Sequence, residues 1–184
     1  RDWSSDVCSS DLVQVVFQDP NRSLNPRRTV GQSIVEGAMN FGAGRSEAQA
    51  LAEQLIAQVR LPVQALARYP SQFSGGQRQR IAVARALACK PEVLVADEAV
   101  SALDVSVQAQ ILDLLRDIQA QLGLGLLFIT HDLRVAAQLC DRVIVMQRGR
   151  IVEQGVTAQL YASPEHDYTR RLLACAPAAL LPRP

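Results

Sequence analysis

The chain of 184 residues is long enough for one domain with a hydrophobic core. Its net charge of +1 gives no reason to expect nucleic-acid binding or attraction to an anionic membrane, and no apolar run reaches the roughly 18 residues of a transmembrane helix. The four cysteines are far apart and lack metal-ligand spacing, so we expect free thiols in a reducing compartment or simply core residues.

Residues 1–12 are polar and show neither helical nor strand periodicity. They lack the apolar segment of a signal peptide, and they resemble the translation of a common sequencing adapter. We therefore expect an assembly artefact joined to a truncated gene, with a natural flexible tail as the alternative. The fold is expected to begin at residue 13.

The first predicted elements are a strand and two helices. An apolar run over residues 13–17 predicts a β-strand, and Gln18 follows it directly. A short helix is expected within residues 21–41, because four apolar positions share one of its faces. The pair Ser46 and Gln49 forms a capping-box pattern, which predicts the start of a second helix that Pro62 ends.

A glycine-rich turn, F-S-G-G-Q over residues 73–77, precedes a helix predicted for residues 77–89. The N–H groups at a helix start are unpaired and the helix dipole adds positive charge, so Ser74, Gly75 and Gly76 can hold an anion. Two glycines would also let an oxyanion approach the backbone closely.

Two carboxylates, Asp97 and Glu98, follow a short apolar run at residues 93–96, which predicts a strand buried on both faces. Ligands bind at such strand ends in open α/β sheets. One carboxylate there can hold Mg²⁺, and a second can orient an attacking water. A Mg²⁺-binding carboxylate, a water-orienting carboxylate and an anion-binding turn are together the groups that nucleotide hydrolysis needs.

The clearest predicted helix covers residues 106–122, with a wide apolar stripe and Gly123 as its C-cap. A second buried strand is expected at residues 124–129, and His131 follows its end. An imidazole can donate to a phosphate oxygen near neutral pH. Beyond it we expect a short helix, a hairpin that turns at residues 147–149, and further helical turns.

In this order and spacing the motifs resemble those of the ATP-binding cassette (ABC) ATPases. F-S-G-G-Q resembles the signature motif, V-L-V-A-D-E the Walker B strand, S-A-L-D over residues 101–104 the D-loop, and I-T-H-D the H-loop. The segments S-L-N-P-R at residue 23 and S-P-E-H-D-Y-T-R at residue 163 resemble the oligopeptide and dipeptide importer branch. One departure is Ala99, where the family often has proline, which would loosen the turn after Glu98.

The resemblance implies an α/β fold, namely an incomplete P-loop-type ABC ATPase core with a mainly parallel sheet and a helical signature subdomain at about residues 31–89. The ATPase domain would cover residues 13–162, and residues 163–184 would form an importer-type C-terminal extension. The resemblance also implies ATP and Mg²⁺ as cofactors, with Glu98 and His131 catalytic and with Asp97 and Gln18 as metal ligands. Nucleotide contacts would come from Gln18, Ser74, Gly75, Gly76, Gln77 and Asp104.

The implied partners are a second ABC ATPase subunit in a head-to-tail homo- or heterodimer, membrane-embedded permease subunits and, indirectly, a solute-binding protein. No nucleic acid is implied. Such a subunit is peripheral, on the cytoplasmic face of the inner or plasma membrane. By the same resemblance, Gln18 would also act as a hinge that senses the permease.

No G-x-x-x-x-G-K-[ST] motif occurs, and the only lysine, Lys90, has no glycine loop before it. We therefore expect the chain to lack the front of the domain, including the Walker A phosphate loop and a central strand, to expose apolar sheet surface and to be inactive alone. Two alternatives stay open. One is a non-transport ABC ATPase, which the importer-type segments do not fit, and the other is a non-catalytic degenerate fragment.

Overall fold

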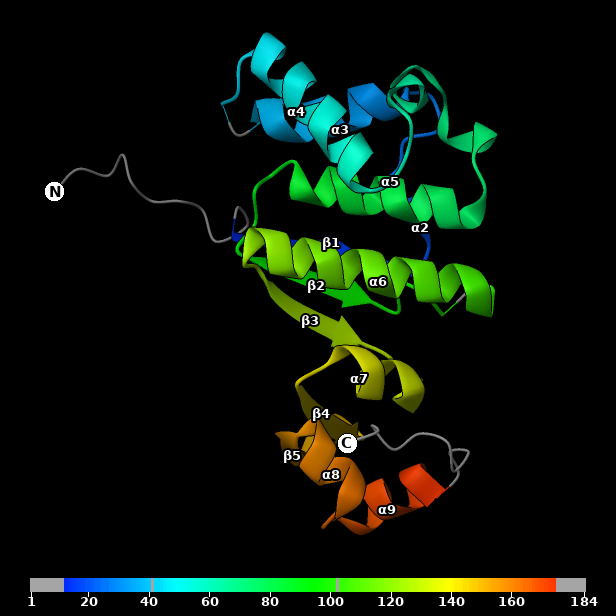
Figure 1. Ribbon diagram of the computed structural model, residues 1–184, viewed down its shortest axis with the longest axis vertical. Helices are drawn as coiled ribbons and strands as arrows, with labels where there is room; N and C mark the ends of the chain where they lie inside the picture. The colour runs from blue at the N-terminus through cyan, green and yellow to red at the C-terminus, as the bar shows by residue number, and fades with distance from the viewer. Residues whose placement is uncertain (1–11, 41, 102, 175–184) are drawn as a thin grey trace, which may run out of the picture. The chain divides into compact units, whose positions relative to one another are not determined.

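The computed structural model describes residues 12–40, 42–101 and 103–174, and the chain divides into two compact units, residues 1–129 and 130–184. Figure 1 shows the elements of each unit. None of the described helices has the length and apolar character needed to span a bilayer. Of the cysteines, Cys89 and Cys140 are partly buried and are not joined in a disulfide, and the other two lie outside the described residues.

A three-stranded parallel sheet forms the centre of the first unit. Its strands are β1 (Val13–Val16), β2 (Val93–Asp97) and β3 (Gly125–Ile129), in the order β1-β2-β3 (Figure 1). The register pairs Val16 with Ala96 and Asp97 with Ile129, so the carboxyl ends of all three strands lie at one edge. The prediction of a parallel α/β sheet is confirmed.

The two faces of this sheet are buried to different extents. One face carries Val16, Leu94 and Ala96, which are at most 1% exposed. On the other face Val15 of β1 and Leu127 of β3 are 40% and 51% exposed. The prediction of β3 as a buried strand is therefore wrong, and β2, which we expected to be buried on both faces, has Val93 and Val95 only partly buried on the second face. Strands β1 and β3 are the two edge strands of the described sheet. The exposed apolar surface that we expected is present.

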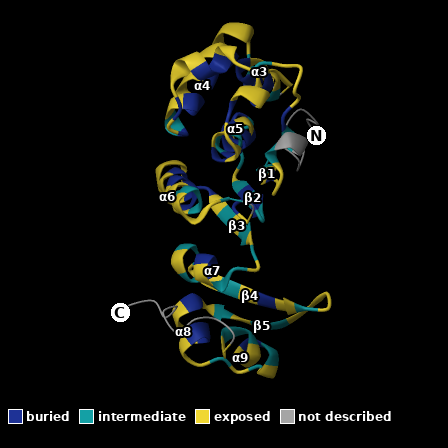
Figure 2. Cartoon of the chain, turned by 90° about the vertical axis from the view of Figure 1, so that its right-hand side faces the viewer, coloured by how far each residue is buried: buried dark blue, intermediate teal, exposed yellow. Residues whose placement is uncertain are grey.

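The helices before β2 are α2 (Pro20–Ser23), α3 (Val30–Asn40), α4 (Arg45–Gln58) and α5 (Gly75–Leu87), with short 3-10 turns η2 (Val63–Ala67) and η3 (Pro70–Gln72) between α4 and α5. Helices α3, α4 and α5 bury their inward faces and expose their outward faces (Figure 2). The predicted capping box at Ser46 is wrong. Helix α4 begins at Arg45 after an extended Gly44, which leaves Ser46 inside the first turn and exposed.

Helix α6 (Val105–Leu122) confirms the long helix that the sequence predicts. Its buried residues follow the apolar stripe, namely Ile111, Leu112, Leu114, Leu115 and Ile118. Gly123 adopts the left-handed conformation, with φ of 64°, and its N–H donates to the carbonyl of Gln119. Glycine ends a helix in this way at little cost because it has no Cβ.

The second unit contains α7 (Leu133–Leu139), the antiparallel hairpin of β4 (Arg142–Gln147) and β5 (Arg150–Val156), α8 (Thr157–Ala162) and α9 (Asp167–Ala174). The predicted hairpin is confirmed, and it turns through Arg148 and Gly149, both with positive φ. The small core of the second unit is built on Val145 of β4 and on Leu160 and Tyr161 of α8. The Tyr161 hydroxyl donates to the carbonyl of Leu133 over 2.6 Å, and burial raises the pKa of this phenol to about 12.

A carboxylate on β5 fastens the segment before α9 to the hairpin. The two oxygens of Glu153 accept hydrogen bonds from consecutive backbone N–H groups, those of Glu165 at 2.8 Å and His166 at 3.1 Å. Burial acts to raise the pKa of Glu153, but the nearby Thr169 hydroxyl, these two hydrogen bonds and the charge of His166 hold it below its ordinary value. Glu153 therefore stabilises the second unit in its ionised form.

Replacing Glu153 by Gln is expected to lower the stability of the second unit at neutral pH by about 1 kcal/mol, allowing for solvent screening. Because the folded pKa is depressed, this contribution is complete above the ordinary value of 4.5 and is lost as the pH falls through the lower folded value. Urea unfolding of both proteins between about pH 3 and pH 7 checks this. Exposed Glu165, changed to Gln, is the control, and a pH-independent difference for Glu153→Gln would contradict the prediction.

Candidate active site

Three of the predicted site residues meet at the carboxyl edge of the parallel sheet. Gln18 lies two residues beyond β1, Asp97 is the last residue of β2, and Glu98 follows it. Glu98 has a φ of 46°, and its N–H donates to the carbonyl of Ile129 at the end of β3 over 3.0 Å. A left-handed conformation costs a non-glycine residue about 1 kcal/mol or more, so neighbouring contacts must hold the turn.

The hydroxyl of Ser101 connects Gln18 to the turn that carries Glu98. It accepts a hydrogen bond from the Gln18 side-chain Nε2 at 3.0 Å and donates to the Glu98 carbonyl at 3.0 Å. The Ser101 N–H also donates to the Glu98 carbonyl, at 3.1 Å. The turn is thus closed although Ala99 stands where proline is common, and Ala99 itself is only 2% exposed.

The signature turn, residues 73–77, caps the start of α5 through two reciprocal hydrogen bonds. Ser74 is the N-cap, and its Oγ accepts from the Gln77 N–H at 3.3 Å, while the Gln77 Oε1 accepts from the Ser74 N–H at 3.0 Å. The helix consequently begins at Gly75, two residues before the predicted start. The N–H groups of Gly75 and Gly76 lie in its first turn, where the helix dipole favours an anion.

The two glycines of this turn are glycine for different reasons. A Cβ on Gly76 would lie 2.3 Å from Cγ1 of Val107, so the packing of α5 against α6 requires glycine there. A Cβ on Gly75 would meet only the Leu103 Cδ2, at an ordinary 3.6 Å. Close approach by an oxyanion, the reason that we expected for both glycines, is therefore not needed to explain Gly76.

Asp104 lies beside the signature turn in the first unit. It is the N-cap of α6 with an extended backbone, its side chain makes no capping hydrogen bond, and the residue is exposed. The preceding Leu103 reaches towards Gly75, which brings the end of the D-loop next to the start of α5. Its predicted contact with nucleotide stays a prediction.

His131 belongs to the second unit and is exposed, so its convergence with Glu98 stays a prediction. The residues on either side of it are joined, because the Asp132 N–H donates to the Thr130 hydroxyl over 2.9 Å. Asp132 caps α7 by accepting from the Arg134 N–H at 2.8 Å. A hydrogen bond from the Arg134 side chain is the main cause that lowers the pKa of Asp132.

The residue types at the sheet edge suit a magnesium ion. In proteins Mg²⁺ takes one or two carboxylates and completes its shell with water and substrate phosphates. Asp97, partly buried at the end of β2, and the amide oxygen of Gln18 fit this pattern by type. In the described ranges, no group of three or more His, Cys, Asp and Glu side chains is arranged as an all-protein metal site.

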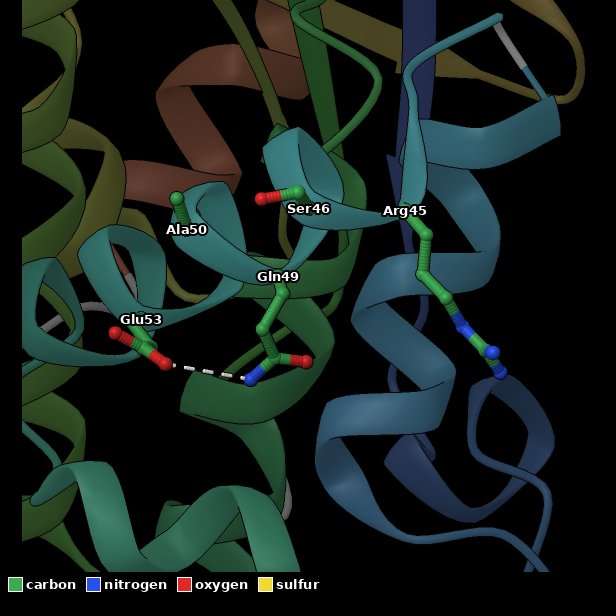
Figure 3. Close-up of a pocket in the computed structure, with 5 residues that line it drawn as sticks. All are labelled: Arg45, Ser46, Gln49, Ala50 and Glu53. Atoms are coloured by element: carbon green, nitrogen blue, oxygen red, sulfur yellow. Dashed lines mark hydrogen bonds between the residues drawn. The ribbon is translucent and has the colours of Figure 1, made fainter.

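A shallow groove on α4 is separate from these residues. It is lined by Arg45, Ser46, Gln49, Ala50 and Glu53 (Figure 3). The Gln49 Nε2 donates to Glu53 over 3.4 Å along the exposed side of the helix. None of the predicted site residues lines this groove.

Comparison with known proteins identifies the family. The sequence profile of the family described as "ABC transporter" matches residues 4–101, just over half of the chain. The chain belongs to the ABC transporter family. Its match begins inside residues 1–12, most of which lie outside the described residues.

Relatives of this ABC transporter chain include several import proteins. A peptide import ATP-binding protein of Brucella ovis is 52% identical over 167 residues, which is 90% of this chain and 53% of the relative. A peptide ABC transporter ATP-binding protein of Sinorhizobium fredii is 54% identical over 166 residues, 90% of this chain and 47% of the relative. The glutathione import ATP-binding protein of Escherichia coli is 48% identical over 174 residues, 93% of this chain and 28% of the relative.

The ABC fold is shown by a solved structure as well. CbiO1 of Clostridium perfringens, described as part of an ABC transporter complex, matches with a TM-score of 0.76 at 28% identity and covers 92% of this chain and 66% of that one. Judged by the share of each relative that is matched, the chain spans about half the length of the peptide-import relatives. The family match and the structural match together show an ABC ATPase domain.

Proposed function

We propose that this chain is part of an ABC subunit that hydrolyses ATP to power the import of peptides or related solutes. The hydrogen-bonded cluster of Gln18, Ser101 and Glu98 at the sheet edge is the observation that carries the proposal. The cluster supports the proposal because Glu98 and the Gln18 amide follow the carboxyl ends of parallel strands, the edge at which open α/β sheets bind ligands. The names of the relatives support peptides as the transported class.

Each residue then has a defined chemical role. Glu98 accepts a proton from the attacking water and orients it, while His131 donates to the terminal phosphate. Asp97 and Gln18 would hold Mg²⁺, which neutralises charge on the phosphates. The turn of Ser74, Gly75, Gly76 and Gln77, with Asp104 beside it, would face the terminal phosphate of an ATP held by a second subunit.

This arrangement requires partners. The ATP would lie between two ABC subunits, identical or different, that face each other head to tail. Permease subunits would transmit the closure of this dimer across the membrane, and a solute-binding protein would deliver the solute to them. The subunit would therefore be peripheral, on the cytoplasmic face of the inner or plasma membrane.

Phosphate release measured on the whole subunit that carries this sequence tests the proposal. With its permease in vesicles, we expect turnover that requires Mg²⁺ and increases when a solute-binding protein and peptide are present. The 184-residue chain alone is the control and is expected to release no phosphate above background. No hydrolysis by the whole subunit would favour the non-catalytic alternative, and hydrolysis without any coupling to peptide would favour a non-transport ATPase.

A further inference from the structure

A buried glutamine lies in α5, the helix that begins at the signature turn and is called the signature helix below. Gln79 is only 1% exposed, although an unsatisfied side-chain amide in a protein interior is costly. Its Nε2 donates to the backbone carbonyl of Phe17 over 3.2 Å, and the two residues are 62 positions apart in the sequence. The hydrogen bond therefore joins α5 to the end of β1.

The carbonyl that Gln79 binds belongs to the peptide group between Phe17 and Gln18. Holding that oxygen fixes the plane of the peptide from which Gln18 extends. The side chain of Phe17 is 47% exposed and Gln18 is also exposed, so packing restrains this segment only weakly. A hydrogen bond from a rigid, buried side chain is then a strong restraint on the backbone at this point.

Gln18 is thus held at two places. Gln79 fixes its backbone from the signature helix, and Ser101 binds its side-chain amide from the turn that carries Glu98. Through these contacts the helix that begins with the signature turn is connected to the carboxyl edge of the sheet within one unit. Without the Gln79 hydrogen bond, β1 and α5 would keep their folds, but Gln18 would be able to move relative to Glu98.

We propose that Gln79 is a positioning residue for Gln18, so that the signature helix and the strand-end cluster keep one alignment. Gln79 touches neither phosphate nor metal in this role. The effect on hydrolysis rests on the proposed function, whereas the restraint on the Phe17 and Gln18 backbone is a property of the chain itself.

Amide hydrogen exchange in the 184-residue chain tests the restraint directly. In Gln79→Met, which keeps the volume but cannot donate, exchange in residues 13–19 is expected to be about three- to tenfold faster, the factor of one net hydrogen bond. The matched control is Gln58→Met, which also removes a 3.2 Å amide hydrogen bond, from Gln58 to Gln121, on the neighbouring helix α4. It should leave residues 13–19 unchanged.

Gln79→Leu is a second variant of similar volume, and its apolar side chain cannot donate to the carbonyl either. Faster exchange at residues 13–19 in either variant, with β2 unchanged, supports the proposal. Unchanged exchange there in both, or a uniform increase over the whole first unit, would overturn it. This readout does not depend on ATP hydrolysis.

Turnover in the whole subunit then shows whether Gln79 acts through Gln18. Gln79→Met is expected to lower kcat by about three- to tenfold with little change in the KM for ATP. In a Gln18→Ala background the same substitution should have almost no further effect, because its target has been removed. Additive losses would overturn a role through Gln18, and absence of turnover in the wild type would count against the proposed function while the exchange result stood.

Discussion

Glu98→Gln is expected to reduce ATP hydrolysis by the whole subunit by about 10²–10⁴-fold, because an amide cannot accept the proton of the attacking water. ATP binding should persist, since Gln keeps the shape of Glu and the turn is held by its backbone. The Glu98 N–H bonds to Ile129 and the Glu98 carbonyl to Ser101, and neither contact uses the carboxylate. The variant should therefore hold ATP without hydrolysing it.

Single-turnover hydrolysis and binding of labelled ATP measure the two effects separately. Glu92→Gln is the matched control, because Glu92 is exposed and directly precedes β2, at the end of the strand away from the site. It should retain wild-type turnover. Near-normal hydrolysis by Glu98→Gln would show that another group accepts the proton.

Gly76→Ala is expected to destabilise the first unit by about 1–3 kcal/mol, the usual cost of overpacking. The added methyl would lie 2.3 Å from Cγ1 of Val107, and a branched side chain in a helix has little freedom to rotate away. The start of α5 and the start of α6 would have to separate. Urea unfolding followed by circular dichroism measures the loss.

Gly75→Ala provides the control for this substitution, because its Cβ would have 3.6 Å of clearance from Leu103. Alanine in the first turn of a helix should change the stability by less than about 1 kcal/mol, in the stabilising direction. Val107→Ala should restore much of the stability that Gly76→Ala loses, as expected for two residues in direct contact. An unchanged free energy of unfolding in Gly76→Ala would contradict the prediction and would mean that α6 can shift away from α5 at little cost.

The elements that could be predicted are those with strong local signals. Helix α6 has an apolar stripe and a glycine cap, and the hairpin of β4 and β5 has its turn residues at Arg148 and Gly149. The parallel sheet followed from short apolar runs separated by helices. Among the site residues, Asp97 and Glu98 were predicted from their place at a strand end and Gln18 from the family resemblance, and the structure brings all three to one edge.

The errors arise where local patterns compete with tertiary structure. Ser46 and Gln49 match a capping box, but Gly44 supplies the extended N-cap and the helix starts one residue earlier than Ser46. The run that forms β3 reads as a buried strand because an apolar run does not reveal which strand lies at an edge of the sheet. The packing of Gly76 against Val107 could not be read from the sequence either, because the two residues are 31 positions apart.

Two functional contacts were not predicted from the sequence. Ser101 lies 83 residues from Gln18, and Gln79 lies 62 residues from Phe17, so no short-range pattern connects them. A partial signal for Ser101 was present, since a serine three residues after Glu98 is well placed to bond back to its carbonyl. For Gln79 the hint was a polar residue among the apolar positions of α5, which only burial in the structure makes informative.

Under the proposed function, the left-handed backbone of Glu98 lowers thermal stability at the same residue that ATP turnover requires. A glycine at this position would relax the turn, at a gain of about 1 kcal/mol before the extra freedom of the unfolded chain is counted. It would also remove the carboxylate that we propose as the group that activates water. Laboratory evolution that selects only for thermal stability would therefore tend to enrich glycine at position 98 and so yield stable variants without ATP turnover. A parallel selection for transport is needed to keep the glutamate.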